Sequence, residues 1–289
     1  ETATAQTELL YAGENRFTQV RLGVLNLPEG NAMRAPGEAP GLMALEIAMD
    51  ELAEKLNMNP VDLRIVNDTQ VDPVNTDRPY SQRQMIECLK RGAAEFGWSD
   101  EKAYPRPGQR REGEWLVGTG MAVGFRNHLL MKSAARVRLS PDGRVTVETD
   151  MTDIGTGTYA ILTQIAAEML GLDPANVMVE LGDTDFPRGP GSGGSWGAVS
   201  IGSAVVIACD AIRKALADKA GIDADDLKLK DGKLQGSQTR SLSELLDGGS
   251  MSEEGHYEPG DISDDYTSSS FGAFFAQVRV NRDTGEARV

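Results

Sequence analysis

Three segments rich in glycine and proline lead directly into helix-like patterns, and they constrain the fold of this chain more than any other feature. They are residues 31–41, 152–158 and 191–197. The second and third also follow strand-like runs, which predicts two strand–turn–helix units. Such a turn exposes backbone N–H groups at a helix start, where negative charge is favoured. Three helix starts of this type suit a large anionic ligand.

Each segment also has an ordinary interpretation. The turn at 152–158, taken alone, is a common strand–helix connection, and it lacks the spacing of the dinucleotide fingerprint. The stretch 188–197 has six Gly or Pro residues before a long helix, and the alternative is a flexible exposed loop. Arg34 lies near Pro36 and suits oxo-anion recognition, although a surface salt bridge explains it equally well. We expect Glu38 to interact with the N-terminal dipole of the following helix.

The hydrophobic patterns predict an α+β fold with two lobes. We expect strands at 17–27, 115–125, 134–140, 144–150 and 176–182, and a hairpin at 271–289. We expect helices at 41–56, at about 62–66, from an N-cap at Ser81 to residue 97, at 158–171 and at 197–218. Residues 219–262 are acidic and indicate loops. The polar stretch 99–113 marks the best boundary, which gives a first lobe of residues 1–106 and a second of residues 107–289.

Composition excludes several classes of function. The net charge of −15 argues against nucleic acid or an anionic membrane as a partner. No run of 18 apolar residues is present, so no membrane span is expected. The two cysteines, Cys88 and Cys209, are far apart and form no CxxC motif, so we expect no zinc or iron–sulfur site in this chain.

Self-contained catalytic motifs are also missing from the sequence. It has no nucleophile elbow, no HExxH and no P-loop, which is typical of a domain whose difficult chemistry belongs to a cofactor. Phe125 and Arg126 end an apolar strand, where an aromatic and a cationic side chain suit a substrate-facing position. The alternative places Phe125 in the core and Arg126 in solvent.

The ordered set of motifs Met33–Gly37, Thr152–Thr158 and Gly193–Gly197 resembles the molybdenum-binding subunit of the xanthine dehydrogenase/aldehyde oxidase family. Within that family it is most similar to the aldehyde oxidases of the bacterial periplasm. The resemblance implies a two-lobed cofactor-binding region with mixed sheets and packed helices. It implies oxidation of aldehydes to carboxylic acids, with water as oxygen source, at a molybdenum–molybdopterin dinucleotide, expected to be the cytosine form. Electrons would leave to iron–sulfur clusters and FAD on partner subunits. The resemblance alone favours a periplasmic over a cytoplasmic location.

The same resemblance assigns roles to individual residues. Backbone N–H groups of Arg34 and Gly194 would lie near the molybdenum ligands without binding the metal directly. The residues expected around the cofactor are Ile154, Gly155, Thr156, Gly193, Ser195, Gly197 and Ala198. Phe125 and Arg126 would line the substrate pocket. Thr156 stands where many members have Gln, and Arg126 replaces the small hydroxyl residue of purine-oxidising members, which disfavours purine substrates.

The glutamate base of the family lies in a Gly-x-Gly-Glu segment that this sequence lacks, so we expect that base downstream. We therefore expect the chain to be an internal segment, inactive alone, of a longer subunit. A non-catalytic anion-binding or assembly domain is the alternative function, and metal analysis distinguishes the two. A nucleotide-dependent enzyme is less favoured because Rossmann and Walker patterns are missing.

Overall fold

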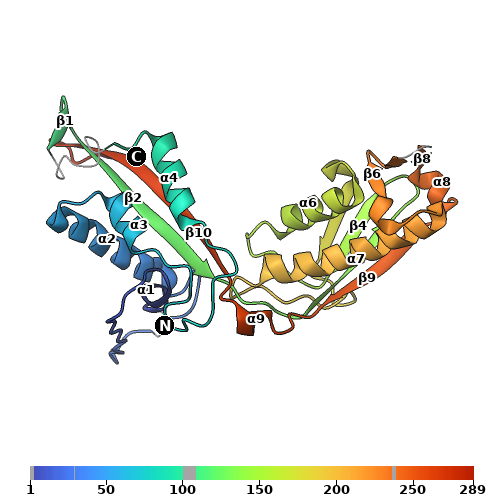
Figure 1. Cartoon of the computed structure of the whole chain (residues 1–289), viewed down its shortest axis with the longest axis horizontal. Coiled ribbons are helices and arrows are strands. Elements are labelled where there is room, and N and C mark those ends of the chain that lie inside the picture. The colour runs from blue at the N-terminus through green and yellow to red at the C-terminus, as the bar shows by residue number, and fades with distance from the viewer. Residues whose placement is uncertain (1–2, 29, 100–108, 236–238) are drawn as a thin grey trace. The chain divides into compact units, whose positions relative to one another are not determined.

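The computed structural model describes residues 3–28, 30–99, 109–235 and 239–289 (Figure 1). The chain forms two compact units. Unit 1 comprises Glu1–Asn127 and Asp264–Val289, and unit 2 comprises His128–Ser263. The short helix α9 (Ile262–Asp265) contains one of the two boundaries between the units. Within the described residues, no helix is both long and apolar enough to cross a membrane.

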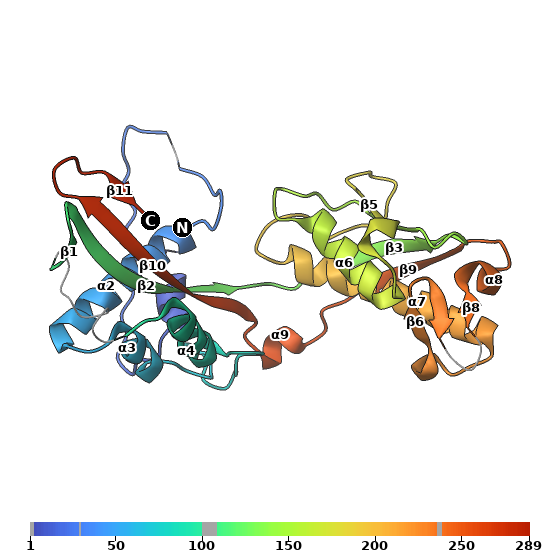
Figure 2. The same ribbon diagram turned by 90° about the horizontal axis from the view of Figure 1, so that it is seen from above.

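Unit 1 is built on a sheet with the strand order β1-β2-β10-β11. Its strands are β1 (Arg110–Glu112), β2 (Trp115–Asn127), β10 (Ser269–Asn281) and β11 (Ala287–Arg288). The long strands β2 and β10 are antiparallel and pair along their whole length, as the crossing green and red arrows of Figure 2 show. Its helices are α1 (Ala5–Leu9), α2 (Glu38–Leu56), α3 (Pro60–Val66) and α4 (Met85–Phe96).

One face of the β2–β10 pair forms the core of unit 1. Side chains alternate between the two faces of a strand, so Met121, Val123 and Phe125 of β2 point to the same side. They pack with Leu10 near α1 and with Leu89 of α4 in one hydrophobic cluster. The core thus fixes the end of β2, where Phe125 and Arg126 lie.

Unit 2 contains a second sheet, with strand order β5-β4-β3-β9. Its strands are β3 (Ser133–Leu139), β4 (Val145–Thr149), β5 (Val177–Leu181) and β9 (Met251–Tyr257). Strands β4 and β5 are parallel, whereas β3 is antiparallel to both β4 and β9. Two long helices, α6 (Thr158–Leu170) and α7 (Gly197–Ala220), pack side by side against this sheet (Figure 2).

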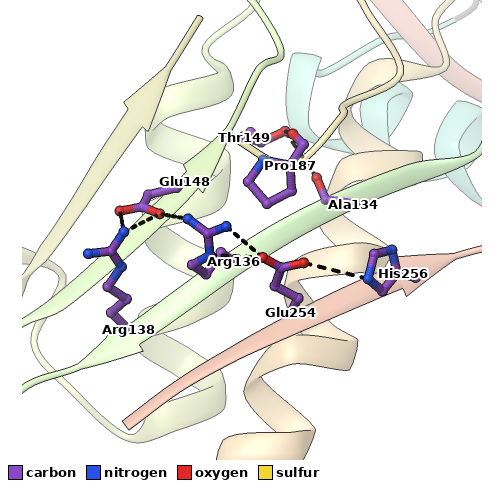
Figure 3. Close-up of polar contacts among 8 residues, drawn as sticks. All are labelled: Ala134, Arg136, Arg138, Glu148, Thr149, Pro187, Glu254 and His256. Atoms are coloured by element: carbon purple, nitrogen blue, oxygen red, sulfur yellow. Dashed lines mark hydrogen bonds and ion pairs between the residues drawn. The ribbon is translucent and has the colours of Figure 1, made fainter. Parts of the chain in front are cut away.

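The two faces of this sheet differ in chemistry. Val137 and Val147 point toward α6 and α7 and are fully buried in the core of the unit. On the other face, Glu148 lies between Arg136 and Arg138, with N–O distances of 2.9 and 2.7 Å (Figure 3). Arg136 also pairs with Glu254 of β9 at 2.6 Å. These ion pairs link β3, β4 and β9 across a polar sheet face.

Smaller elements complete unit 2. They are the 3-10 helices η1 (Pro174–Asn176) and η2 (Ala224–Asp226), the strands β6 (Lys228–Lys230), β7 (Lys233–Gln235) and β8 (Arg240–Ser241), and the helix α8 (Leu242–Leu246). The three short strands form a separate sheet in the order β6-β7-β8.

The predicted α+β class is confirmed, and most of the predicted elements are present to within three residues. Three predictions are wrong. Residues 17–27 form no strand in the described part of the chain, and Phe17, Leu22 and Val24 are each more than 80% exposed. Gln84, not Ser81, precedes the first turn of α4. The stretch 219–262 contains β9, a full strand of the second sheet, because β9 pairs with β3 far away in sequence.

The division into units also differs from the expected lobes of residues 1–106 and 107–289. The units meet after Asn127 and after Ser263, because β10 returns to pair with β2 and carries the end of the chain back into unit 1. Residues 100–108, which contain the expected boundary, lie outside the described residues.

Candidate functional site

The glycine-rich turn at 188–197, called the second turn of unit 2 below, is anchored to the end of the unit 2 sheet. The peptide oxygen of Arg188 accepts the N–H of Ala134 at 2.8 Å, and that of Pro187 accepts the N–H of Asp150 at 2.9 Å. The Thr149 hydroxyl lies between the same segments, 3.1 Å from the Ala134 oxygen and 3.3 Å from the Pro187 oxygen (Figure 3). Residues 187–189 therefore continue the hydrogen bonding of β3 and β4 beyond the regular strands.

The structure brings the two predicted glycine-rich turns of unit 2 together. The hydroxyls of Thr152 and Ser192 are 3.2 Å apart, and the Ser192 hydroxyl also donates to the peptide oxygen of Thr152. Met151 directly precedes one turn and packs against the other, because a Cβ added at Gly189 or Gly197 would come within 2.8 or 2.6 Å of its side chain. Residues 40 positions apart thus form one surface at the starts of α6 and α7.

The turn at 152–158, called the first turn of unit 2 below, contains the carboxylate of Asp153, for which the sequence analysis predicted no role. Oδ1 of Asp153 accepts the N–H groups of Gly155 and Thr156 at 2.7 and 2.9 Å. Desolvation acts to raise the pKa of Asp153, but these backbone hydrogen bonds outweigh it and the pKa lies below its ordinary value. The prediction that these N–H groups face an external anion therefore needs correction, since they donate to Asp153. Ile154, at 62% exposed, points into solvent.

The second turn is sharply bent immediately before α7. Gly194 and Ser195 both have positive φ, at 45° and 56°, a conformation that is uncommon for a residue with a side chain. The Trp196 ring braces the turn: its indole N–H donates to the peptide oxygen of Gly191 at 3.3 Å, and a Cβ on Gly194 would lie 2.1 Å from a ring carbon. Gly197 and the exposed Ala198 form the first turn of α7.

The surface of these turns fits a cofactor that approaches the backbone closely. Gly155, Gly157 and Gly191 all have positive φ, and a Cβ added at any of them would meet no atom within 4 Å. At Gly191, before α7, open backbone of this kind favours anionic groups, whereas the N–H of Gly155 before α6 already donates to Asp153. A groove of about 880 Å³ lies beside the second turn, and its lining carries both signs of charge: Arg188 and Lys132 are accompanied by Glu258 and Asp261, and Lys132 pairs with Glu258 at 2.7 Å. The groove offers space for a large ligand, whereas the preference for negative charge comes from the backbone before α7.

The remaining predicted site residues belong to unit 1. Arg34 is exposed and precedes Ala35, which has a φ of 46°, and Gly37, which has a φ of 82° and directly precedes α2. Phe125 is only 2% exposed and its ring packs edge-on against Tyr80, with centroids 5.8 Å apart. The structure thus gives Phe125 the surroundings of a core residue, and its role as a substrate wall stays a prediction.

Arg126 points to the other face of β2 and is not solvated freely. Its Nη1 donates to Oε1 of Glu38, the first residue of α2. The side chains of Arg126 and Glu38 are 29% and 10% exposed. Burial lowers the pKa of Arg126 from its ordinary value. No local sequence pattern predicts this pair, because the two residues are 88 positions apart.

Comparison with known sequences identifies the class of this chain. A molybdopterin cofactor-binding domain profile matches residues 91–289, and a second profile with the same description matches residues 1–68. The first match covers most of the chain and includes both glycine-rich turns of unit 2. The chain therefore belongs to the molybdopterin cofactor-binding domains of the xanthine oxidase family.

Two individual proteins show how similar the chain is to particular members of this family. The chain is 56% identical over its whole length to the aldehyde oxidoreductase molybdenum-binding subunit PaoC of Escherichia coli K12, and it spans 39% of that protein. It is 28% identical over 97% of its length to the probable hypoxanthine oxidase XdhD of the same organism, and it spans 31% of that protein.

Solved structures agree on the fold. Quinoline 2-oxidoreductase from Pseudomonas putida 86 superposes with a TM-score of 0.69 at 21% identity, over 89% of this chain and 37% of that one. Aldehyde oxidoreductase from Desulfovibrio desulfuricans superposes with a TM-score of 0.61 at 24% identity, over 89% of this chain and 28% of that one. The fold is that of molybdenum hydroxylase large subunits.

Proposed function

We propose that the protein containing this chain oxidises aldehydes to carboxylic acids with a molybdenum–molybdopterin cofactor. The observation that carries the proposal is the 56% identity to PaoC, which extends over the whole chain and includes both glycine-rich turns. In the net reaction an aldehyde and water give a carboxylate, three protons and two electrons. When bound, the molybdenum group supplies this two-electron oxidation with oxygen from water.

The residues of this chain hold and orient the reacting groups. We assign the joined turns of unit 2 to the cofactor: Gly193, Gly194 and Ser195, with Gly197 and Ala198, lie at the start of α7, where the backbone favours negative charge. Ile154 and Thr156 contribute the first turn, which Asp153 keeps in shape. In unit 1, the N–H of Arg34 is assigned to the metal ligands and the guanidinium of Arg126 to hydrogen bonding of the substrate oxygen.

We further propose that the cofactor is the cytosine dinucleotide form, that the partners are an iron–sulfur subunit and an FAD subunit, and that the protein lies in the periplasm of a bacterium. The absence of a CxxC motif from this sequence agrees with iron–sulfur clusters on another subunit. Acid release of the nucleotide, analysis of the copurified subunits and cell fractionation test these assignments separately.

The decisive experiment uses the full-length protein purified with its partners. We expect about one molybdenum per chain and turnover of benzaldehyde to benzoate with an artificial electron acceptor. Molybdenum-free protein that still forms the complex would favour the non-catalytic assembly function. Full molybdenum content without aldehyde turnover would contradict the proposed substrate class.

A further inference from the structure

The ion pair between Glu38 and Arg126 joins two segments that the chain brings together only by folding. Glu38 begins α2 directly after Gly37, and Arg126 lies one residue before the end of β2. The side chain of Glu38 is 10% exposed, so its carboxylate is largely removed from water. A buried charge of this kind requires compensation, which the guanidinium supplies.

The start of α2 reinforces the negative charge of Glu38. Among the residues that the structure describes, no side chain caps this 19-residue helix, and Glu38 lies in its first turn, where the helix dipole favours a carboxylate. One oxygen of Glu38 accepts from Arg126, whereas the other, Oε2, is buried without a hydrogen-bond partner among the described residues. The carboxylate of Glu38 therefore interacts with the guanidinium of Arg126 and with the N-terminal dipole of α2.

The proposed reaction gives this pairing a chemical consequence. An aldehyde substrate is uncharged at its reacting carbon, but the product is a carboxylate. A guanidinium without a counter-charge binds carboxylates through two parallel hydrogen bonds. An unpaired arginine at the substrate position would therefore retain the product. A guanidinium already paired with a carboxylate can still donate a hydrogen bond, but its net attraction for a second anion is weaker.

We propose that Glu38 is a positioning and specificity-determining residue, which holds Arg126 so that it donates to an uncharged aldehyde while limiting retention of the carboxylate product. This inference rests on the proposed function, because it requires Arg126 to face the substrate. It predicts that weakening the pair favours anionic ligands over neutral ones.

The test uses the full-length enzyme with its partner subunits and the variants Glu38→Asp and Glu38→Gln. The first shortens the carboxylate arm, and the second removes the charge with little change of shape. We expect the inhibition constant for benzoate to fall from wild type to Glu38→Asp and to fall about tenfold or more in Glu38→Gln, since a charged hydrogen bond is then released for the product. Direct calorimetric binding of benzoate to the resting enzyme should follow the same order.

Two further variants show whether the effect passes through Arg126. In the double variant Glu38→Gln/Arg126→Gln, tight benzoate binding should be lost. Asp50→Asn is a matched control, because it removes a carboxylate of the same helix that pairs with Arg64 instead. It should leave benzoate binding unchanged. Molybdenum content and thermal unfolding are measured for every variant.

Several outcomes would overturn the proposal. They are unchanged or weaker benzoate binding in both Glu38 variants, tighter binding that persists without Arg126, and an equal effect of Asp50→Asn. If Glu38→Gln does not retain molybdenum, benzoate inhibition and binding are compared between the wild type and Glu38→Asp. Failure of the proposed function looks different, because the wild-type enzyme would then contain molybdenum but oxidise no aldehyde.

Discussion

The carboxylate of Asp153 accepts the backbone N–H of Gly155 at 2.7 Å, and thereby holds the turn that leads into α6. The same oxygen accepts from Thr156. A negative charge thus lies within a turn that we assign to an anionic cofactor. The charge would weaken cofactor binding if it faced the cofactor, but it favours binding if its hydrogen bonds hold the turn in the required conformation. Substitutions of Asp153 separate these two effects.

We predict that Asp153→Ala lowers the molybdenum content of the full-length protein more than Asp153→Asn. The Asn side chain keeps an oxygen acceptor for Gly155 and Thr156 and removes only the charge, whereas Ala removes both. Metal analysis of the purified variants checks this order. An equal loss of molybdenum in Asp153→Asn and Asp153→Ala would contradict this order and mean that the charge itself is required.

The lowered pKa of Asp153 also predicts a pH dependence of stability. Because the folded-state pKa lies below the ordinary value of 3.8, the carboxylate stabilises the fold above pH 3.8, and this contribution is lost as the pH falls through the folded-state pKa. The wild-type chain should therefore unfold at a higher temperature than Asp153→Asn between pH 5 and 7, and the difference should shrink below pH 4. A difference that stays constant to pH 3 would contradict the prediction.

We predict that Gly194→Val removes most of the molybdenum from the full-length protein. Its φ of 45° is strained for a side chain, and the new Cβ would collide with the Trp196 ring. Gly143→Val is the matched control, because its φ is 82° but an added Cβ meets no atom within 4 Å and it lies in the β3–β4 hairpin. A left-handed φ costs each variant roughly 1–2 kcal/mol. Equal loss of molybdenum in both would show that general destabilisation is responsible.

Sequence patterns predicted the helices and strands that are determined by residues close together in the chain. Helices α6 and α7 show apolar residues at helical spacing, and each ends at a glycine in the left-handed conformation, Gly171 and Gly221. The β3–β4 hairpin likewise lies around Ser140 and Gly143, where a short turn joins two apolar runs. In each case neighbouring residues determine the structure.

The missed features depend on residues that are distant in sequence. Strand β9 alternates polar and apolar residues only weakly, and its place depends on pairing with β3. Residues 17–27 have the opposite property, a strand-like pattern without a partner strand among the described residues, and a strand needs such pairing for its backbone. The Asp153 interaction was the exception, because an Asp two residues before a glycine is a local turn signal.

We predict that Glu46→Leu destabilises unit 1 by about 3 kcal/mol. The Glu46 carboxylate accepts from Tyr11, from Arg64 and from the N–H of Val123, at 2.7 to 2.8 Å. The Arg64 side chain is fully buried, so removing Glu46 leaves a buried charge with Asp50 as its remaining ion-pair partner. Urea unfolding measures the loss. The double variant Glu46→Leu/Arg64→Met should recover part of it, and a double variant less stable than the single one would refute this account.

We predict that Gly255→Ala is among the most damaging single-methyl changes in unit 2. Gly255 lies in β9 opposite Ala135 of β3, where α7 packs directly on the sheet. An added Cβ would lie 2.0 Å from the peptide oxygen of Ala204 and 2.6 Å from the peptide nitrogen of Ala208. Both contacts are with helix backbone, which cannot move aside as a side chain can, so α7 must shift away from β9.

Overpacking of this kind typically costs about 1–3 kcal/mol. Gly118→Ala in β2 is the matched control, because it adds the same methyl to a strand glycine where no atom lies within 4 Å. Urea unfolding of the two variants should show a loss for Gly255→Ala and little change for Gly118→Ala. In the full-length protein, a shift of α7 should also disturb the turn that precedes Gly197 and lower the molybdenum content. Wild-type stability in Gly255→Ala would show that the helix and the sheet can separate at no cost, and close packing would then not be what holds this turn in place.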